Sequence, residues 1–229
     1  MYKYAIIVAG GAGTRIGGEL PKQFQLLKGR QVLWYTLKAF TDAYEDVQII
    51  LVLPGDHMEK GEELTKEFPS QRIRMTSGGQ TRFQSVKNGL GFVDAHSIVF
   101  VHDGVRCLVT AELIRRCGEA TLEKGNAIPS VEITDTIRIE TAAGYEPMDR
   151  KHVRIIQTPQ TFLSTIIKPA FEQPYEESFT DDACVVERTG VKINLIEGEA
   201  TNIKITRPVD LLIAEKILEE RVKVLNSKF

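Results

Sequence analysis

Residues 4–15 read YAIIVAGGAGTR, an apolar and β-branched run that passes directly into a glycine-rich loop. The run predicts a buried strand, and the carboxyl ends of strands are where open α/β sheets place their ligands. Gly10, Gly11 and Gly13 let backbone N–H groups approach phosphate oxygens, because no Cβ stands in the way. By itself, the loop predicts either a cradle for a triphosphate or a tight strand-to-helix turn.

Two common glycine motifs do not fit this loop. A Walker A motif ends in Gly-Lys-Ser/Thr, which is missing here. A dinucleotide-binding motif needs an acid about 20 residues beyond the glycines, and the region around Arg30 supplies none. A nicotinamide-dependent oxidoreductase is therefore not favoured.

The rest of the chain alternates short apolar runs with longer amphipathic stretches, which predicts one α/β sandwich over residues 1–229. Buried strands are expected at Tyr4–Ala9, Val47–Leu53, Ile73–Thr76 and Ile98–Val101. The stretch Pro21–Ala39 should cross to the second strand.

Two helices are marked by their sequence signals. Thr81 and Gln84 form a capping box that should open a helix. Pro208 and Asp210 should open the last helix, which is expected to pack on the sheet. The face predicted to be buried carries Leu211, Ala214, Leu218 and Val222.

One segment interrupts the α/β pattern. Between Ile137 and Ile156, two extended runs flank Ala143-Gly144, which predicts a β-hairpin arm. A hairpin that stands alone is marginal in water, so this arm should lie against something, and a second subunit is a natural candidate.

Composition limits the classes of partner. Lys and Arg (29) nearly balance Asp and Glu (31), so the net charge of −2 gives no general attraction to nucleic acid. Cys107, Cys117 and Cys184 lie far apart, which suggests neither a zinc site nor a disulfide framework. The apolar run Ala5–Ala9 is too short for a membrane span and unlike a signal peptide. A reducing cytoplasm is the expected location.

Two cations follow the glycine loop, Arg15 and Lys22. Transfer of a nucleotidyl group adds negative charge at the α-phosphate in the transition state, and fixed cations there lower the barrier. Arg offers a bidentate fork and Lys a point charge. The alternative is that both are solvated surface charges.

Two further motifs follow strands. Ser77-Gly78-Gly79-Gln80-Thr81-Arg82 contains paired glycines that can admit a pyrimidine edge, but taken alone the motif favours a simple turn. In His102-Asp103-Gly104-Val105-Arg106, Asp103 can hold Mg²⁺ and Arg106 a phosphate. The alternative is a private Asp103–Arg106 pair. His102 is expected to be structural, satisfying a backbone carbonyl.

Two weaker signals lie nearer the C-terminus. Thr180-Asp181-Asp182 favours an ordinary helix start, with Thr180 as its N-cap and acids in the first turn. The strand-like run Asn202–Thr206 carries Lys204, which needs an anion if it points inward.

Taken together, these segments resemble the 2-C-methyl-D-erythritol 4-phosphate cytidylyltransferases of the non-mevalonate isoprenoid pathway. The match covers nearly the whole chain in order. The motifs that carry it are the glycine loop through Pro21-Lys22-Gln23, Gly-Gly-x-x-Arg-x-x-Ser-Val (78–86), His-Asp-x-x-Arg (102–106), Asp135-Thr136, Gln157-Thr158-Pro159-Gln160, Thr180-Asp181-Asp182-Ala183 and Asn202-Ile203-Lys204.

The resemblance implies a Rossmann-like nucleotide-diphospho-sugar transferase sandwich, with a mixed, mostly parallel sheet and a protruding arm that dimerises. Arg15 and Lys22 would be catalytic. CTP would be held by Ala9, Gly10, Gly11, Ala12, Gly13, Gly79, Gln80, Ser85 and Lys204. Asp103 would bind Mg²⁺. The sugar phosphate would contact Asp103, Arg106, Thr136, Arg150, Thr158 and Thr180, with Thr136 and Arg150 coming from the partner's arm.

Two positions depart from the family pattern. Cys107 replaces a frequent proline after Arg106, which should loosen that loop, and Gln80 replaces a frequent acid. Ribitol 5-phosphate cytidylyltransferase is the nearest alternative, because its alditol phosphate is similar. A non-catalytic nucleotide-binding module would have little use for Arg15, Lys22 and Asp103 together.

Overall fold

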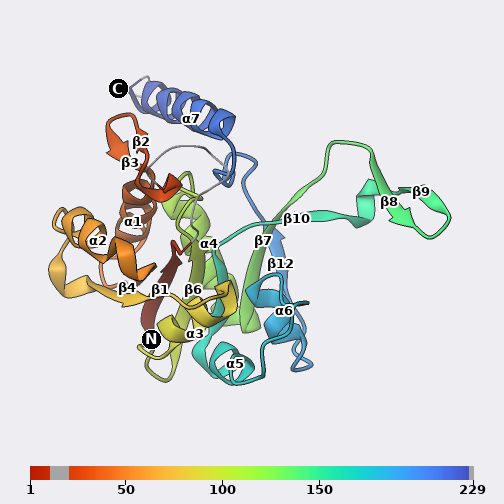
Figure 1. The fold of residues 1–229 in the computed structure, drawn as a ribbon, viewed down its shortest axis with the longest axis horizontal. Coiled ribbons are helices and arrows are strands. Elements are labelled where there is room, and N and C mark those ends of the chain that lie inside the picture. Colours follow the sequence, from red (N-terminus) through yellow and green to blue (C-terminus); the bar gives the residue numbers. More distant parts are fainter. Residues whose placement is uncertain (11–20, 227–229) are drawn as a thin grey trace.

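A computed structural model of the protein describes residues 1–10 and 21–226. Its centre is a mixed sheet in the order β10-β7-β11-β6-β1-β4-β5, with β12 beside β7 (Figure 1). The strands are β1 (Tyr2–Val8), β4 (Gln48–Leu53), β5 (Ile73–Ser77), β6 (Ser97–Asp103), β7 (Asn126–Glu132), β10 (Arg154–Ile156), β11 (Gln160–Leu163) and β12 (Leu195–Glu197). The strands β6, β1, β4 and β5 run parallel, whereas β11 is antiparallel to β6 and β7. The predicted mixed, mostly parallel sheet is confirmed.

Helices cover both faces of this sheet. They are α1 (Val32–Ala43), α2 (Met58–Thr65), α3 (Arg82–Leu90), α4 (Ala111–Lys124), α5 (Ser164–Ala170), α6 (Asp182–Glu187) and α7 (Pro208–Asn226). Short 3-10 turns lie at η1 (Lys22–Phe24), η2 (Gly55–His57), η3 (Ser70–Arg72) and η4 (Arg150–His152).

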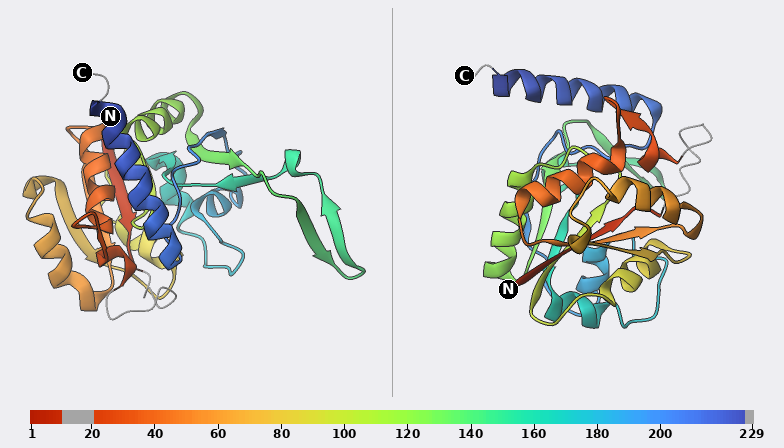
Figure 2. Two further views of the ribbon diagram at one scale, coloured as in Figure 1. Left: turned by 90° about the horizontal axis from the view of Figure 1, so that it is seen from above. Right: turned by 90° about the vertical axis from the view of Figure 1, so that its left-hand side faces the viewer.

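Neighbouring residues of the central strands point to opposite faces. Ile7 and Leu51 join α1, α2 and α4 in one apolar cluster, and Ile6 and Ile50 join α3, α5 and α6 in another. Figure 2 shows the helices on the two sides of the sheet. Because both faces are covered, these strands are apolar almost throughout, and every residue of β6 is buried.

The capping box that opens α3 is confirmed. The Thr81 hydroxyl accepts from the Gln84 backbone N–H at 3.1 Å, and the Gln84 side chain accepts from the Thr81 N–H at 3.2 Å. This satisfies two N–H groups that the first turn of a helix leaves without partners. It also fixes where the preceding glycine turn meets the helix.

The last helix begins at Pro208 as predicted, but the prediction that it packs on the central sheet is wrong. Its buried Ala214 joins a third cluster with Leu27, Leu108 and Ile205, beside the small hairpin of β2 (Leu26–Leu27) and β3 (Arg30–Gln31). Figure 1 shows α7 lying across this end of the molecule. Val222, expected on the buried face, is exposed.

The predicted arm is present but shorter than expected. β8 (Ile137–Thr141) and β9 (Gly144–Met148) pair only with each other and project from the body (Figure 1). Residues 154–156, assigned to the arm from sequence, form β10 and pair with β7 in the central sheet. The sequence could not separate the hairpin from residues 154–156, because both are extended and they differ only in the strands with which they pair.

Candidate active site

A cavity of about 550 Å³ opens at the carboxyl ends of β1 and β6. Loops from the ends of parallel strands meet there, as open α/β sheets require of a ligand site. It is lined by Val8, Ala9, Gly10, Lys22, Gln23, Gly79, Gln80, Thr81, Arg82, Ser85, Asp103, Val105 and Lys204. Eight residues predicted to belong to the site therefore lie together, namely Ala9, Gly10, Lys22, Gly79, Gln80, Ser85, Asp103 and Lys204. Gly11, Ala12, Gly13 and Arg15 lie outside the described residues.

The end of β1 is held by contacts from three directions. The Ala9 N–H donates to the Val52 carbonyl at 2.9 Å, and the buried Gln23 amide donates to the Ala9 carbonyl at 2.8 Å. Gln23 thereby ties the turn that carries Lys22 to the start of the glycine loop. A Cβ at Gly104 would lie 2.9 Å from the Ala9 Cβ, so glycine allows the ends of β1 and β6 to come together.

Ser85 shapes the glycine turn on the opposite wall. Its hydroxyl accepts from the Gly79 N–H at 3.1 Å and donates to the Thr81 carbonyl at 3.0 Å. A Cβ at Gly79 would lie only 2.4 Å from the Gln84 Cβ, so the turn needs glycine there. Ser85 is 3% exposed, and its hydroxyl serves the turn that borders the cavity.

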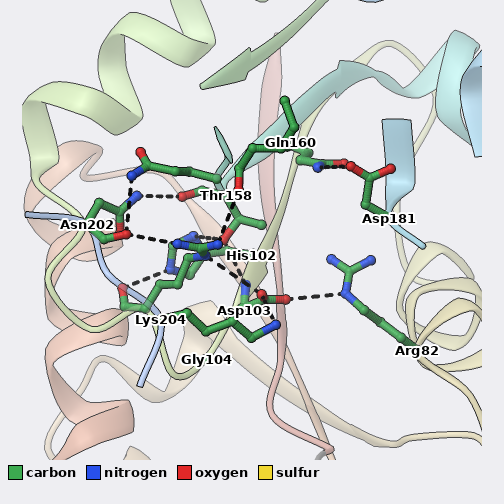
Figure 3. Close-up of polar contacts among 12 residues, drawn as sticks. Arg82, His102, Asp103, Gly104, Thr158, Gln160, Asp181, Asn202 and Lys204 are labelled. Carbon is green, nitrogen blue, oxygen red and sulfur yellow. Dashed lines mark hydrogen bonds and ion pairs between the residues drawn. The ribbon is translucent and has the colours of Figure 1, made fainter. Parts of the chain in front are cut away.

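Asp103 is the anionic centre of the cavity (Figure 3). One carboxylate oxygen lies 2.8 Å from the Lys204 Nζ, and the other lies 3.3 Å from the Arg82 Nε. The Arg106 Nε is more distant, at 3.8 Å. Burial alone would raise the pKa of Asp103, but these cations outweigh it and hold that pKa well below its ordinary value. Lys204 therefore has the anion that its inward position required.

His102 is structural, as predicted. Its Nδ1 lies 3.0 Å from the Thr158 hydroxyl, which also accepts from the Asp103 N–H, so the hydroxyl proton points to Nδ1. Nε2 then carries the ring proton and donates to the Arg106 carbonyl at 3.2 Å. Burial lowers the pKa of His102 from 6.5 to about 3, so the imidazole is neutral at pH 7.

Arg106 and Thr158 do not line the cavity. The Arg106 guanidinium donates to the Asn202 carbonyl at 2.9 Å and to the Ile156 carbonyl at 3.3 Å, which joins three segments of the chain. The 3.8 Å approach to Asp103 is secondary, so the alternative of a private Asp103–Arg106 pair is not what the structure shows. Thr158 is buried behind the same strand end.

Three other predicted substrate residues lie away from the cavity. Thr136 and Arg150 are exposed at the base of the arm, where the Arg150 guanidinium donates to the Thr134 carbonyl. Thr180 is exposed before α6, and the expectation that it caps this helix is wrong. Asp181 is the N-cap, because its carboxylate accepts from the Cys184 N–H at 2.8 Å.

One pair at the site escaped the sequence analysis. Asp182 is fully buried and accepts two hydrogen bonds from the Arg82 guanidinium, at 2.8 and 2.7 Å. Burial raises the pKa of Asp182, and the Arg82 charge opposes that shift. From sequence, Asp182 looks like an acid favourable in any first helical turn, and only the fold brings it to Arg82.

The residues present fit one Mg²⁺ ion bound together with a nucleotide. Within residues 1–10 and 21–226, no three His, Cys, Asp or Glu side chains gather as a metal site. Mg²⁺ usually keeps several waters and takes one or two carboxylates plus substrate phosphates. Asp103, ionised and lining the cavity, would supply that single carboxylate.

A glycine-bordered cavity at the ends of parallel strands, with one lysine and two arginines around a buried aspartate, defines an α/β enzyme that handles nucleotides. Comparison with known proteins makes this class specific. Residues 3–220 match the family model IspD, 2-C-methyl-D-erythritol 4-phosphate cytidylyltransferase. The chain belongs to this family.

Individual relatives agree over their full length. Proteins named 2-C-methyl-D-erythritol 4-phosphate cytidylyltransferase from Bacteroides fragilis and Bacteroides thetaiotaomicron are 44% and 46% identical, over 95% of this chain and 100% of each relative. A crystal structure of 4-diphosphocytidyl-2C-methyl-D-erythritol synthase from Anaerococcus prevotii superposes with a TM-score of 0.83 at 30% identity, covering 95% of this chain and 96% of that one. The predicted family and fold are confirmed, and the ribitol phosphate alternative is not favoured.

Within residues 1–10 and 21–226, no helix is both long enough and apolar enough to cross a membrane.

Proposed function

We propose that this protein joins CTP and 2-C-methyl-D-erythritol 4-phosphate to give 4-diphosphocytidyl-2-C-methyl-D-erythritol and pyrophosphate, a step in isoprenoid precursor synthesis. The observation that carries the proposal is the cavity itself. The end of β1, Lys22, the Gly79 turn and Asp103 all line this cavity of about 550 Å³. Each of these has a role in transfer at phosphorus.

In the proposed reaction, a phosphate oxygen of the sugar alcohol attacks the α-phosphorus of CTP. One P–O bond forms there, and the bond from the α-phosphorus to the bridging oxygen breaks, so pyrophosphate leaves with the bonding electrons. The attacking oxygen is already anionic near pH 7, and therefore positioning and charge stabilisation are the main tasks. Lys22, together with Arg15, supplies positive charge at the α-phosphate. Mg²⁺, when held by Asp103, would neutralise triphosphate charge.

The nucleotide would occupy the cavity, with the backbone from Ala9 to Gly13 around the phosphates. Gly79 and Gln80 would meet the pyrimidine edge, and the hydroxyl of Ser85 would keep their turn in shape. Lys204 would move from Asp103 to a phosphate, because its side chain is 43% exposed and both lie at the cavity.

Nucleotide and acceptor choice tests this proposal. Pyrophosphate release should be fast with CTP and methylerythritol phosphate. It should be much slower when UTP replaces CTP, or when ribitol 5-phosphate replaces methylerythritol phosphate. Fixed backbone groups at the Gly79 turn would select the 4-amino group of cytosine. Equal kcat/KM for CTP and UTP would contradict this, and no release with either acceptor would favour a binding module.

We further propose a homodimer in which each arm completes the neighbouring site. The hairpin is exposed along nearly its whole length and carries Ile139, Tyr145 and Met148 at 39%, 66% and 40% exposure. An isolated two-stranded hairpin is marginal, so apolar side chains on it favour burial against a second copy. Thr136 and Arg150, at the arm's base, would then contact the partner's sugar phosphate, beside Asp103 and Thr180 of the site they enter.

Mixing two inactive variants tests the arm exchange. In a heterodimer of Arg15→Ala with Arg150→Ala, crossing arms leave one site intact, whereas arms that serve their own subunit leave both sites damaged. Half of the dimers are mixed after full exchange, so about a quarter of the wild-type activity should return. Complete exchange, verified by mass, without recovered activity would show that the arm does not cross.

We also propose a cytoplasmic location for the enzyme. All three cysteines are free thiols, and two of them are buried, which suits a reducing compartment.

A further inference from the structure

Two carboxylates beside the cavity share one guanidinium. Arg82 directs both terminal nitrogens at Asp182, at 2.8 and 2.7 Å, and only its Nε at Asp103, at 3.3 Å. Arg82 and Asp103 line the cavity, whereas Asp182 is fully buried behind them. The bidentate face of the arginine is therefore turned away from the carboxylate that faces the ligand.

This orientation matters because a guanidinium binds a carboxylate most strongly through two parallel hydrogen bonds. Arg82 already touches Asp103, so a modest rotation would let it close on this carboxylate with its fork. Asp103 would then be neutralised by a tightly bound cation and would attract a metal ion much less. Lys204, the other cation on Asp103, is 43% exposed and free to follow a phosphate.

We propose that Asp182 is a positioning residue that holds the fork of Arg82 away from Asp103, so that Asp103 remains available to a divalent metal. The inference rests on the proposed function, in which Asp103 and the nucleotide phosphates share Mg²⁺. Asp182 itself touches neither metal nor nucleotide and acts through Arg82. Arg82, in turn, contacts Asp103 only through its Nε at 3.3 Å, which leaves the rest of that carboxylate available to other ligands.

The charges give the proposal its direction. Lys204 at 2.8 Å and Arg106 at 3.8 Å also lie beside Asp103, so the carboxylate is well neutralised before a nucleotide binds. When Lys204 follows a phosphate, Asp103, Asp182 and Arg82 present one net negative charge to a divalent ion. Asp182→Asn leaves the side chain's shape but makes the trio neutral and removes the stronger partner of Arg82. The guanidinium should then turn to Asp103. Adding Arg82→Gln to Asp182→Asn removes this competitor and returns the negative charge to Asp103.

The test is the coupling between metal and nucleotide, measured without an acceptor so that no turnover occurs. CTP affinity is titrated by calorimetry with Mn²⁺ and again with EDTA, and the ratio of the two Kd values is compared between variants. Asp182→Asn should reduce this ratio about tenfold or more, as loss of an outer partner of a metal ligand does. The double variant with Arg82→Gln should recover most of it.

Asp181→Asn is the matched control, because it makes the same charge change at the start of the same helix. Asp181 accepts hydrogen bonds from the Cys184 N–H and the Gln160 amide, so its loss should leave the ratio unchanged. Thermal unfolding of each variant confirms that folded protein is compared.

Two results would overturn the inference while leaving the proposed function intact. One is a ratio of CTP Kd values in Asp182→Asn equal to that of the wild type. The other is a reduced ratio in Asp182→Asn that the double variant with Arg82→Gln does not restore. A wild-type ratio of one would reject the metal role of Asp103 and this inference together. If Mn²⁺ strengthens CTP binding to the wild type, but the wild type releases no pyrophosphate with either acceptor, the proposed function alone is rejected.

Discussion

The buried imidazole of His102 should make the folded protein sensitive to mild acid. Its pKa falls from 6.5 to about 3 on burial, so an unfolded chain takes up a proton below pH 6.5 that the folded protein refuses until about pH 3. Because the unfolded state binds more protons in this window, the free energy of unfolding falls as the pH falls through it. The contribution of His102 is fully present above pH 6.5.

The size of the effect follows from the same two pKa values. At pH 5, the solution lies about 1.5 pH units below the ordinary pKa of histidine, and each unit is worth about 1.4 kcal/mol. Acidification from pH 7 to pH 5 should therefore remove about 2 kcal/mol of stability through His102 alone. Such a loss is a large fraction of the stability of a typical domain.

Urea unfolding at pH 7, 6 and 5, followed by circular dichroism at one protein concentration, measures this effect. His102→Gln keeps a donor for the Arg106 carbonyl but has no proton to gain. The variant should start less stable, yet lose about 2 kcal/mol less than the wild type between pH 7 and pH 5. Parallel pH dependences of the two proteins would refute the reasoning, since they would mean that His102 does not resist protonation.

Two further substitutions test the walls of the cavity. Lys22→Ala should lower kcat about 10²–10³-fold with little change in KM for CTP, because the proposed contact strengthens in the transition state; steady-state kinetics decide, and a raised KM with normal kcat would assign Lys22 to ground-state binding. Gly79→Ala should lower kcat/KM for CTP by up to about 10²-fold, because the new Cβ meets Gln84 and displaces the turn. Unchanged CTP kinetics in that variant would show that the turn does not border the nucleotide.

The central fold could be predicted from sequence because local signals and tertiary structure agree there. The apolar runs at β1, β4 and β6 are buried on both faces, β5 is a half-buried edge strand, and the Thr81 capping box fixes the start of α3. The sequence was less informative for α7, which has apolar residues around most of its circumference. Periodicity shows that such a helix packs on something but does not say on what.

The site was predictable where a residue's chemistry alone suggests a ligand, and less so where the fold supplies the partner. Lys204 was expected to need an anion if it pointed inward, and Asp103 was expected at the end of a strand; the two meet at 2.8 Å. Arg106 was predicted to hold a phosphate because it follows Asp103 at a strand end. In the folded chain, its terminal nitrogens donate to two backbone carbonyls from distant segments, and its Nε lies 3.8 Å from Asp103.

The environment of His102 also constrains how the proposed reaction proceeds. Histidine is the usual general base near pH 7, and one lies directly beside Asp103 in the chain. Both ring nitrogens are committed to buried partners, Thr158 and the Arg106 carbonyl, and the ring has no exposed surface. A base must come within hydrogen-bond reach of the proton it takes, which this ring cannot do without leaving its site. His102 therefore does not take a proton from the acceptor, and we expect the acceptor phosphate to enter as its dianion. The kcat/KM for the acceptor, measured between pH 5 and pH 8, should then follow the second ionisation of that phosphate.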